Sequence, residues 1–270
     1  MVVALKGVLA DERLFETGRD RFRLGLLARL ERRNARSADR VLVTSEYSRR
    51  RALQHYGLSA DRVRIVPEGI AIESWAHLPS RRSRDDGPVV LSVARQYRRK
   101  NTASLGRAMV EVRRHVAAVR LRIVGDGPEM PALRKLAHDL GLDDGTVEFT
   151  GALAGLAELQ SEYSAATVFA LPSLQEGFGI VFLEAMAAGL PIVAASAGAV
   201  PEVAPDDEVA LLVHPGDDRA LARAIVRLLL QPELARRLAA AGRNRCLRYA
   251  WPDVARRFLE ASEALDLATR

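Results

Sequence analysis

The sequence contains a single cysteine, Cys246, among its 270 residues, so no disulfide can form within the chain. A chain without disulfides is compatible with a reducing compartment. Aromatic residues make up only 5% of the chain, which is few for a protein that stacks single-stranded nucleic acid on aromatic side chains. No apolar run approaches the ~18 residues that a membrane-spanning helix needs. These absences favour a cytoplasmic protein and count against nucleic acid as a partner.

The composition is that of a folded protein with a basic surface. Hydrophobic residues make up 49% of the chain and charged residues 27%, which is typical of a globular rather than a disordered sequence. The formal net charge of +6 favours anionic partners such as phosphates or a membrane surface. The opening residues MVVAL are too short for the apolar core of a signal peptide. We expect a cytoplasmic protein of one large or two small domains, with peripheral membrane contact as an alternative.

Short segments of strand character alternate with longer segments of helical periodicity. From residue 88 onward the alternation is regular, which is typical of βαβ units in a parallel sheet. The expected strands of this sheet are 89–94, 120–124, 147–149, 167–170, 192–195 and 210–213, and the expected final helices are 217–230, 232–247 and 252–268. Residues 1–68 predict only three strands and two helices, which is too little for a complete Rossmann-like domain.

Residues 19–37, RDRFRLGLLARLERRNARS, predict a basic amphipathic helix. Phe22, Leu26, Leu27 and Leu30 fall roughly on one face of it. We expect this apolar face to pack on the N-terminal sheet, with the arginines in solvent. The alternative is that the helix lies on an anionic membrane and brings the protein to a lipid-linked acceptor.

The segment from Leu171 to Pro191, LPSLQEGFGIVFLEAMAAGLP, places a carboxylate inside an apolar helix. The run from residue 180 to 188 predicts a short buried helix that ends at Gly189, and Glu184 lies in its middle. A buried carboxylate is rarely left unpaired, because desolvating a bare charge costs several kcal/mol. We expect Glu184 to accept the hydroxyls of a ribose; the alternative is a structural ion pair with an arginine.

Three loops at the expected carboxyl ends of the strands could bind a ligand, because this edge of a parallel sheet carries its chemistry. The loop RQYRRKN at 95–101 has four cations, which suit a diphosphate but also suit a solvated loop. The loop Gly125-Asp126-Gly127-Pro128 is a weak signal, for which a structural turn is the favoured interpretation, and Pro128 is expected in the first turn of a helix. The glycine-flanked helix entry after Glu176 predicts backbone amides that hold a diphosphate.

These motifs resemble the retaining glycosyltransferases of family four. Glu176 and Glu184, with seven residues between them, look like that family's paired-glutamate motif. The segment VLSVARQYRRKN is similar to its strand followed by an arginine and, five residues on, a lysine, here Arg95 and Lys100. RLRIVGDGPEMPALRKLA, VEFTGAL, GAVPEV and LLVHPGD follow in the family's order, and ADRVLVTSEYSRR and RIVPEGI resemble the end of its first domain and its hinge. The resemblance covers about residues 38–250.

The resemblance implies an α/β fold of the GT-B type, with two facing Rossmann-like domains. We expect a partial N-terminal, acceptor-side domain at 1–68 and a complete C-terminal, nucleotide-sugar-binding domain at 69–250. A terminal helix within 251–270 would cross back toward the N-terminal part. Family members carry a whole first domain, much of which is missing here. A partner chain that supplies the missing part is therefore one expectation.

The resemblance also implies the site and the reaction, a metal-independent transfer of a sugar from a nucleoside diphosphate with retention of anomeric configuration. Its implied site residues are Arg95, Lys100 and Glu176 for catalysis, and Glu184, Gly177, Phe178, Gly179 and Gly125 for donor binding. Arg95 and Lys100 would stabilise the departing diphosphate, and Glu176 would contact the sugar. No cofactor is implied, and the sequence contains no Asp-x-Asp pair to bridge a metal to the diphosphate.

The acceptor side is poorly represented in the sequence. The family often has a histidine there, but none occurs before His55, which falls in a predicted helix, and nothing favours Lys6 over Asp11 as a substitute. Cys246 is expected to pack rather than react. Two other functions compete with the transferase: a donor-binding subunit or inactive pseudoenzyme that needs a partner chain, and a sugar-nucleotide epimerase. The paired glutamates with Arg95 and Lys100 favour the transferase.

Overall fold

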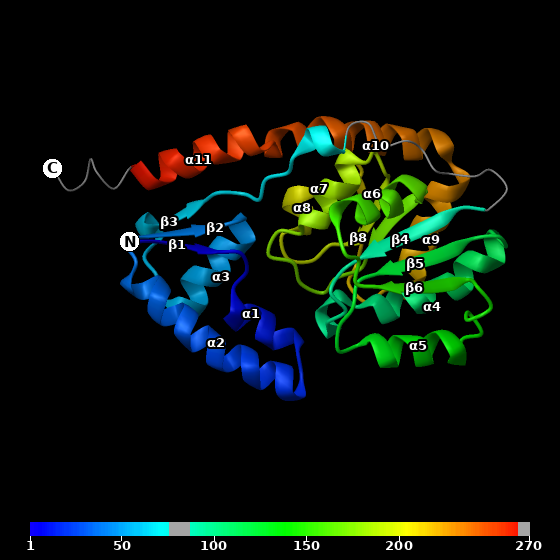
Figure 1. Ribbon diagram of the computed structural model, residues 1–270, viewed down its shortest axis with the longest axis horizontal. Coiled ribbons are helices and arrows are strands. Elements are labelled where there is room, and N and C mark those ends of the chain that lie inside the picture. The colour runs from blue at the N-terminus through cyan, green and yellow to red at the C-terminus, as the bar shows by residue number, and fades with distance from the viewer. Residues whose placement is uncertain (76–86, 264–270) are drawn as a thin grey trace.

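The computed structural model describes residues 1–75 and 87–263. It contains two parallel sheets, one of three strands in the order β1-β2-β3 and one of six in the order β6-β5-β4-β7-β8-β9 (Figure 1). The α/β fold with parallel sheets is therefore confirmed. His77 and the expected end of the last helix at residue 268 lie outside the described residues.

The N-terminal sheet is formed by β1 (Val2–Leu5), β2 (Arg40–Val43) and β3 (Val63–Ile65). The connections are α1 (Leu9–Glu12), α2 (Gly18–Ser37) and α3 (Glu46–Tyr56). Ser45 begins α3, because its side chain accepts a hydrogen bond from the Ser48 amide, and Gly57 ends it in the left-handed conformation. This half has its own small core, in which Tyr56 packs with Val41 and Val43.

The C-terminal half is a six-stranded sheet with helices on both faces. Its strands are β4 (Val89–Val93), β5 (Arg120–Val124), β6 (Val147–Gly151), β7 (Val168–Leu171), β8 (Ile192–Ala195) and β9 (Ala210–Val213). Its helices are α4 (Thr102–His115), α5 (Met130–Asp139), α6 (Leu156–Ala165), α7 (Ile180–Ala187), α8 (Val200–Val203), α9 (Asp218–Leu230) and α10 (Pro232–Cys246). The chain proceeds outward from β4 to β6 and then from β7 to β9, so the strand order reverses between β4 and β7. Ligands of doubly wound sheets bind at such a switch point.

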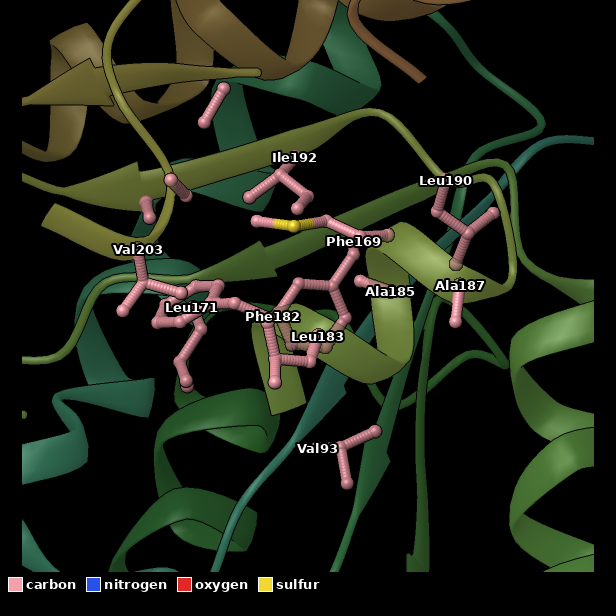
Figure 2. Close-up of a cluster of buried hydrophobic side chains, with 14 of the residues drawn as sticks. Val93, Phe169, Leu171, Phe182, Leu183, Ala185, Ala187, Leu190, Ile192 and Val203 are labelled. Carbon is pink, nitrogen blue, oxygen red and sulfur yellow. The ribbon is translucent and has the colours of Figure 1, made fainter. Parts of the chain in front are cut away.

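The main core lies beside this switch point and fixes the position of α7 (Figure 2). Phe182 and Leu183 of α7 are fully buried, and Phe169 of β7 meets the Phe182 ring edge-on at 5.9 Å between ring centres. Burying side chains of this size stabilises the fold by roughly 1.5–3 kcal/mol each. The helix that carries Glu184 is therefore held rigidly against the sheet.

The final helix, α11 (Trp251–Glu263), connects the two halves. Figure 1 shows it running from the C-terminal half across to the N-terminal sheet. Its Val254 is buried together with Leu42 of β2 and Val66. The start of the helix is also fixed, because Gly69 packs so closely on Trp251 that a Cβ there would lie 2.6 Å from the indole ring.

Two local expectations were wrong. The first turn of α5 contains Pro131 rather than Pro128, which lies in the turn before the helix. The apolar face of α2 does not pack on the sheet: the side that packs carries the small residues Ala28 and Ala35. Phe22 is 71% exposed, and Leu26 and Leu30 are exposed with it.

Candidate functional site

A cleft of about 530 Å³ lies between the two halves, at the carboxyl ends of β4 and β7. Lys6 and Glu68 line it from the N-terminal half. From the C-terminal half it is lined by the residues that follow those two strands, including Arg95, Lys100, Glu176, Gly177, Phe178 and Gly179. An adjoining hollow of about 710 Å³ shares Arg95 with this cleft and extends past Gly125 and Gly127. The structure thus brings most of the predicted site residues to one place.

The four cations of the loop after β4 divide into two pairs with different surroundings. Arg95 is exposed and stacks on the Tyr97 ring at 5.3 Å, and Lys100 binds Glu176 with 2.6 Å between Nζ and Oε1. Arg98 instead donates to the Thr17 hydroxyl at 3.3 Å, and Arg99 pairs with two carboxylates of the N-terminal half. Two of the loop's four cations, Arg98 and Arg99, therefore join the two parts of the molecule, although Arg99 also lines the cleft.

Glu176 is 6% exposed and is held in place by two donors. Its Oε1 accepts from Lys100 and, at 2.8 Å, from the hydroxyl of Ser173, which is fully buried. Sequence reasoning missed Ser173, because a serine three residues before a glutamate is too common to be a signal. The two contacts fix one carboxylate oxygen and orient the other.

Glu184 meets a tyrosine rather than an arginine. The hydroxyl of Tyr163, which is fully buried in α6, donates to Glu184 Oε2 at 2.7 Å. Burial raises the pKa of Glu184 above its ordinary value, and the Tyr163 hydrogen bond only partly opposes this. Val181 lies three residues earlier on the same side of α7 and lines the adjoining hollow, so Glu184 lies about one helical turn beyond that wall.

The loop from Gly177 to Gly179 offers backbone amides to the cleft. Gly179 has a φ of +87°, a conformation that glycine adopts without strain, and it is the last residue before α7 begins. The Phe178 side chain turns inward, where it is 4% exposed and packs edge-on against Tyr249. In the described part of the chain, no acceptor meets the N–H groups of Gly177, Phe178 and Gly179. Such amides at a helix entry suit an anion.

Gly125 has a structural reason to be glycine. Its φ is +108°, and a Cβ there would lie 2.0 Å from the backbone oxygen of Ala94. A Cβ at Gly127 would similarly lie 2.6 Å from the oxygen of Gln96. The two glycines allow the loop after β5 to pack directly on the loop after β4, and both line the hollow. The turn is required by backbone packing, whatever ligand the hollow holds.

The structure places the two acceptor-side candidates of the N-terminal half, Lys6 and Asp11, in different surroundings. Asp11 is fully buried and accepts hydrogen bonds from Tyr47 at 2.6 Å and from Gln175 of the opposite half at 3.2 Å. Lys6, in contrast, lines the cleft and pairs with Glu68 at 2.9 Å. Of the two acceptor-side candidates, Lys6 is therefore the one placed to meet a ligand. Asp11 instead links the two halves through its hydrogen bond with Gln175.

The remaining candidates lie away from the cleft or are packed. His55 is buried enough that desolvation, followed by the charge of Arg51, lowers its pKa. Burial raises the pKa of the Cys246 thiol to about 11, which leaves it protonated and unreactive at neutral pH. Within residues 1–75 and 87–263, no three His, Cys, Asp or Glu side chains gather as a metal site would require. None of the helices described there has the length and apolarity to cross a bilayer.

Both halves of the chain match models of glycosyltransferase families. Residues 87–231 match the model described as "Glycosyl transferases group 1", and residues 10–74 match the model described as "Glycosyltransferase Family 4". The chain is 36% identical over 227 residues to the GDP-mannose-dependent alpha-(1-6)-phosphatidylinositol monomannoside mannosyltransferase of Mycolicibacterium smegmatis, covering 79% of this chain and 59% of the relative. It is 35% identical over 230 residues to D-inositol 3-phosphate glycosyltransferase of Saccharomonospora viridis, covering 79% and 53%. The chain thus spans somewhat over half the length of these curated relatives.

Two solved structures have the same fold over nearly the whole chain. Sucrose-phosphate synthase from Thermosynechococcus elongatus aligns with a TM-score of 0.81 and 28% identity, covering 99% of this chain and 68% of that protein. Anabaena HepE in complex with UDP and glucose aligns with a TM-score of 0.81 and 24% identity, covering 98% and 71%. The likeness to HepE concerns the fold alone.

Proposed function

The chain belongs to the group 1 glycosyl transferases, and from that premise we propose that it transfers a sugar from a nucleoside diphosphate sugar to an acceptor. The observation that carries the proposal is the convergence of Arg95, Lys100 and Glu176 on the cleft at the strand switch point. A cation pair, a carboxylate and free loop amides are the groups that a sugar diphosphate requires. The acceptor is a glycan, a lipid-linked sugar or a small molecule.

The two cations act on the leaving group. As the bond between the sugar and the diphosphate breaks, negative charge develops on a phosphate oxygen. Arg95 and Lys100 lie where they would offset that charge, and preorganised charges of this kind lower the barrier to reaction. Lys100 leaves its contact with Glu176 when the diphosphate binds, and this frees the carboxylate to accept hydroxyls of the donor sugar.

Glu184 binds the ribose of the donor. Tyr163 occupies one carboxylate oxygen, which orients the other for the ribose hydroxyls. The nucleoside then lies in the hollow beside Gly125 and Gly127, and the diphosphate lies under the amides of the loop from Gly177 to Gly179. This arrangement uses every donor-side residue that the sequence predicted.

Retention of configuration and independence of metal are part of the proposal. The paired glutamates support retention through the family resemblance, in which the departing phosphate itself takes the acceptor proton. Metal independence is supported by the two cations beside Glu176, since they supply the positive charge that a bridging metal would provide. Transfer that is unaffected by excess EDTA, with an α-anomeric donor giving an α-anomeric product, would agree with both statements. Loss of activity in EDTA, or an inverted product, would refute one of them.

The alternative is a donor-binding subunit or inactive pseudoenzyme whose acceptor wall comes from a partner chain. The observation that favours it is that β1 is an edge strand of the N-terminal sheet. Among the described residues it pairs with β2 alone, so its other side could pair with a strand of a partner chain. On this alternative the chain binds the donor but neither transfers nor hydrolyses it alone. A second chain would restore activity.

One set of measurements separates these functions. The purified chain is titrated with UDP-glucose, GDP-mannose and ADP-glucose by calorimetry and then incubated with the radiolabelled donor that binds. Binding with transfer to added glycans or water supports the enzyme, whereas binding without turnover supports the subunit. No binding to any of the three overturns both. Glu208→Gln, at an exposed position remote from the cleft, serves as the control for site variants such as Glu184→Ala.

The exposed face of α2 supports a peripheral membrane contact. Phe22, Leu26 and Leu30 recur at intervals of four residues and are exposed, and Arg19 and Arg23 are exposed among them. Apolar side chains interspersed with arginines suit an anionic bilayer surface. We propose that this face of α2 contacts an anionic bilayer surface, which would bring the cleft to a lipid-linked acceptor.

Vesicle sedimentation tests this contact. The chain should bind vesicles containing phosphatidylglycerol, and a Phe22→Ser, Leu26→Ser double variant should lose that binding while keeping donor affinity. Leu230→Ser, at another exposed leucine, is the matched control. Equal binding to neutral phosphatidylcholine vesicles, or undiminished binding of the double variant, would overturn the proposal.

A further inference from the structure

Three hydroxyl groups from the N-terminal half converge on one backbone oxygen of the donor loop. The Gly177 carbonyl accepts from Thr44 Oγ1 at 3.1 Å, Ser45 Oγ at 2.6 Å and Ser48 Oγ at 2.9 Å. All three donors are nearly inaccessible to solvent. A carbonyl oxygen has two lone pairs, so the three donors share them and together hold the oxygen in place. This is an unusual concentration of buried polar groups on a single acceptor.

The same hydroxyls lie at the start of α3, where Ser45 is also the N-cap residue. Ser45 Oγ accepts from the Ser48 amide, so its lone pair caps α3 while its proton goes to Gly177. The two amides that precede Ser48 in α3, those of Glu46 and Tyr47, each donate at 2.8 Å to the carboxylate of Glu202 in α8. The first turn of α3 is therefore satisfied from the opposite half of the molecule.

The hydroxyls fix a peptide whose orientation its own sequence does not determine. Glycine has the widest choice of backbone conformations, so the loop of Gly177, Phe178 and Gly179 could present either face of its peptides to the cleft. The Gly177–Phe178 peptide is planar and trans. Its N–H therefore points opposite to its carbonyl, away from α3, and among the described residues no backbone acceptor meets it.

We propose that Thr44, Ser45 and Ser48 are positioning residues, which hold the Phe178 amide in the orientation that binds the sugar diphosphate. The inference rests on the proposed function, because it assigns a task to groups that touch the donor loop but not the donor. It explains why the hydroxyls are buried at an interface rather than replaced by apolar side chains. It also makes donor affinity depend on the N-terminal half, although the donor binds to the C-terminal half.

The test compares donor affinity with fold stability in single-site variants. Thr44→Val, Ser45→Ala and Ser48→Ala each remove one donor from the Gly177 carbonyl, whereas Thr44→Ser keeps the hydroxyl at that position. Calorimetry with GDP-mannose, UDP-glucose and the matching free diphosphates gives the affinities, and thermal melts without ligand give the stabilities. Since one hydrogen bond is worth about 1 kcal/mol, each removal should weaken donor binding about fivefold, and Thr44→Ser should bind like the wild type.

Two control variants separate positioning from a merely structural role. Ser37→Ala removes a hydroxyl that also donates to a carbonyl in the N-terminal half, but at an exposed site on α2. Glu202→Gln weakens a different contact between the halves without touching Gly177. If Glu202→Gln reduces donor affinity as much as the hydroxyl variants do, the hydroxyls only hold the halves together and the inference is wrong. Thr44→Val is nearly isosteric and provides the decisive comparison if a serine variant does not fold.

The outcomes distinguish this inference from the proposed function. If the wild type binds none of the nucleotides, the proposed function itself has failed. If the wild type binds a donor and folded Thr44→Val and Ser48→Ala bind it equally well, the proposed function stands and the positioning role is overturned. Weaker binding in those variants, with normal binding in Ser37→Ala and Glu202→Gln, supports the role.

Discussion

Lys100 and Glu176 form an ion pair on the C-terminal side of the cleft, with 2.6 Å between Nζ and Oε1. The residue expected to hold the diphosphate and the residue expected to contact the sugar therefore neutralise each other. The side chains are 15% and 7% exposed, so neither is stabilised by much water. Each residue consequently has a structural task as well as its proposed task with a ligand.

The first prediction is that Lys100→Ala destabilises the fold as well as impairing the reaction. Removing the lysine leaves the Glu176 carboxylate with Ser173 alone, and an unpaired buried charge of this kind costs about 1–3 kcal/mol. The double variant Lys100→Ala, Glu176→Gln should recover most of that loss. Urea unfolding at neutral pH measures both variants, and additive losses would show that the ion pair contributes nothing.

The second prediction is that Arg95→Ala impairs the reaction and leaves the fold intact. Arg95 is exposed and contacts the Tyr97 ring, so its loss removes little packing. Turnover should fall roughly 10²-fold, the usual effect of removing one preorganised donor of this kind, with an unchanged melting temperature. Arg98→Ala, on the same loop but directed at Thr17, should retain turnover. Equal losses in the two variants would indicate a general effect of charge.

The sequence predicted the C-terminal half well because its signals there are local. The boundaries expected for residues 120–124 and 192–195 agree with β5 and β8, since a short run of strand character between breakers specifies each of them. The cations after β4 and the glycines after β5 and β7 were found as motifs. Their meeting at the cleft follows from the parallel sheet, whose carboxyl ends share one edge.

What the sequence could not predict depends on contacts between distant segments. The helix α1 has only four residues, too few for their own helix propensity to specify it, and Asp11 within it is buried against Tyr47 and Gln175. The amphipathic pattern of α2 suggested the wrong packing face, because Ala28 and Ala35 rather than the larger apolar residues meet the protein. Amphipathicity shows that a helix has two faces and does not show which of them is covered.

The third prediction concerns Gly125. An alanine there would place its Cβ 2.0 Å from the Ala94 oxygen in a backbone conformation that only glycine adopts easily, so the loops after β4 and β5 must separate. We expect a loss of roughly 1–3 kcal/mol in stability from this strain and a weaker nucleotide site. Gly141→Ala, also at positive φ but in open space, is the control. The Gly141→Ala variant measures the free-energy cost of a positive φ alone, without the steric clash that Gly125→Ala would make with the Ala94 oxygen.

The fourth prediction is that Glu184→Gln stabilises the ligand-free protein increasingly as the pH rises. Burial raises the pKa of Glu184 above its ordinary value of 4.5, so the folded protein prefers the protonated acid. The corresponding stability is present in full below that ordinary value and is lost as the pH rises through the folded pKa. Glutamine cannot ionise and keeps the acceptor for the Tyr163 hydroxyl. The melting temperature of the variant should therefore exceed that of the wild type by a margin that grows from about pH 4 to about pH 8.

The same substitution should weaken nucleoside diphosphate binding, because the ribose hydroxyls lose a charged acceptor and a hydrogen bond to a charged group is worth about 1.5–3 kcal/mol. Glu208→Gln, at an exposed carboxylate, should show neither effect. A stability gap that stays constant with pH would mean that Glu184 ionises as freely in the fold as in water. If the variant is more stable but binds nucleotide normally, the destabilising carboxylate of Glu184 must serve a purpose other than nucleotide binding. Stabilisation combined with weaker binding is the result expected if the carboxylate is kept in an apolar helix for its ligand.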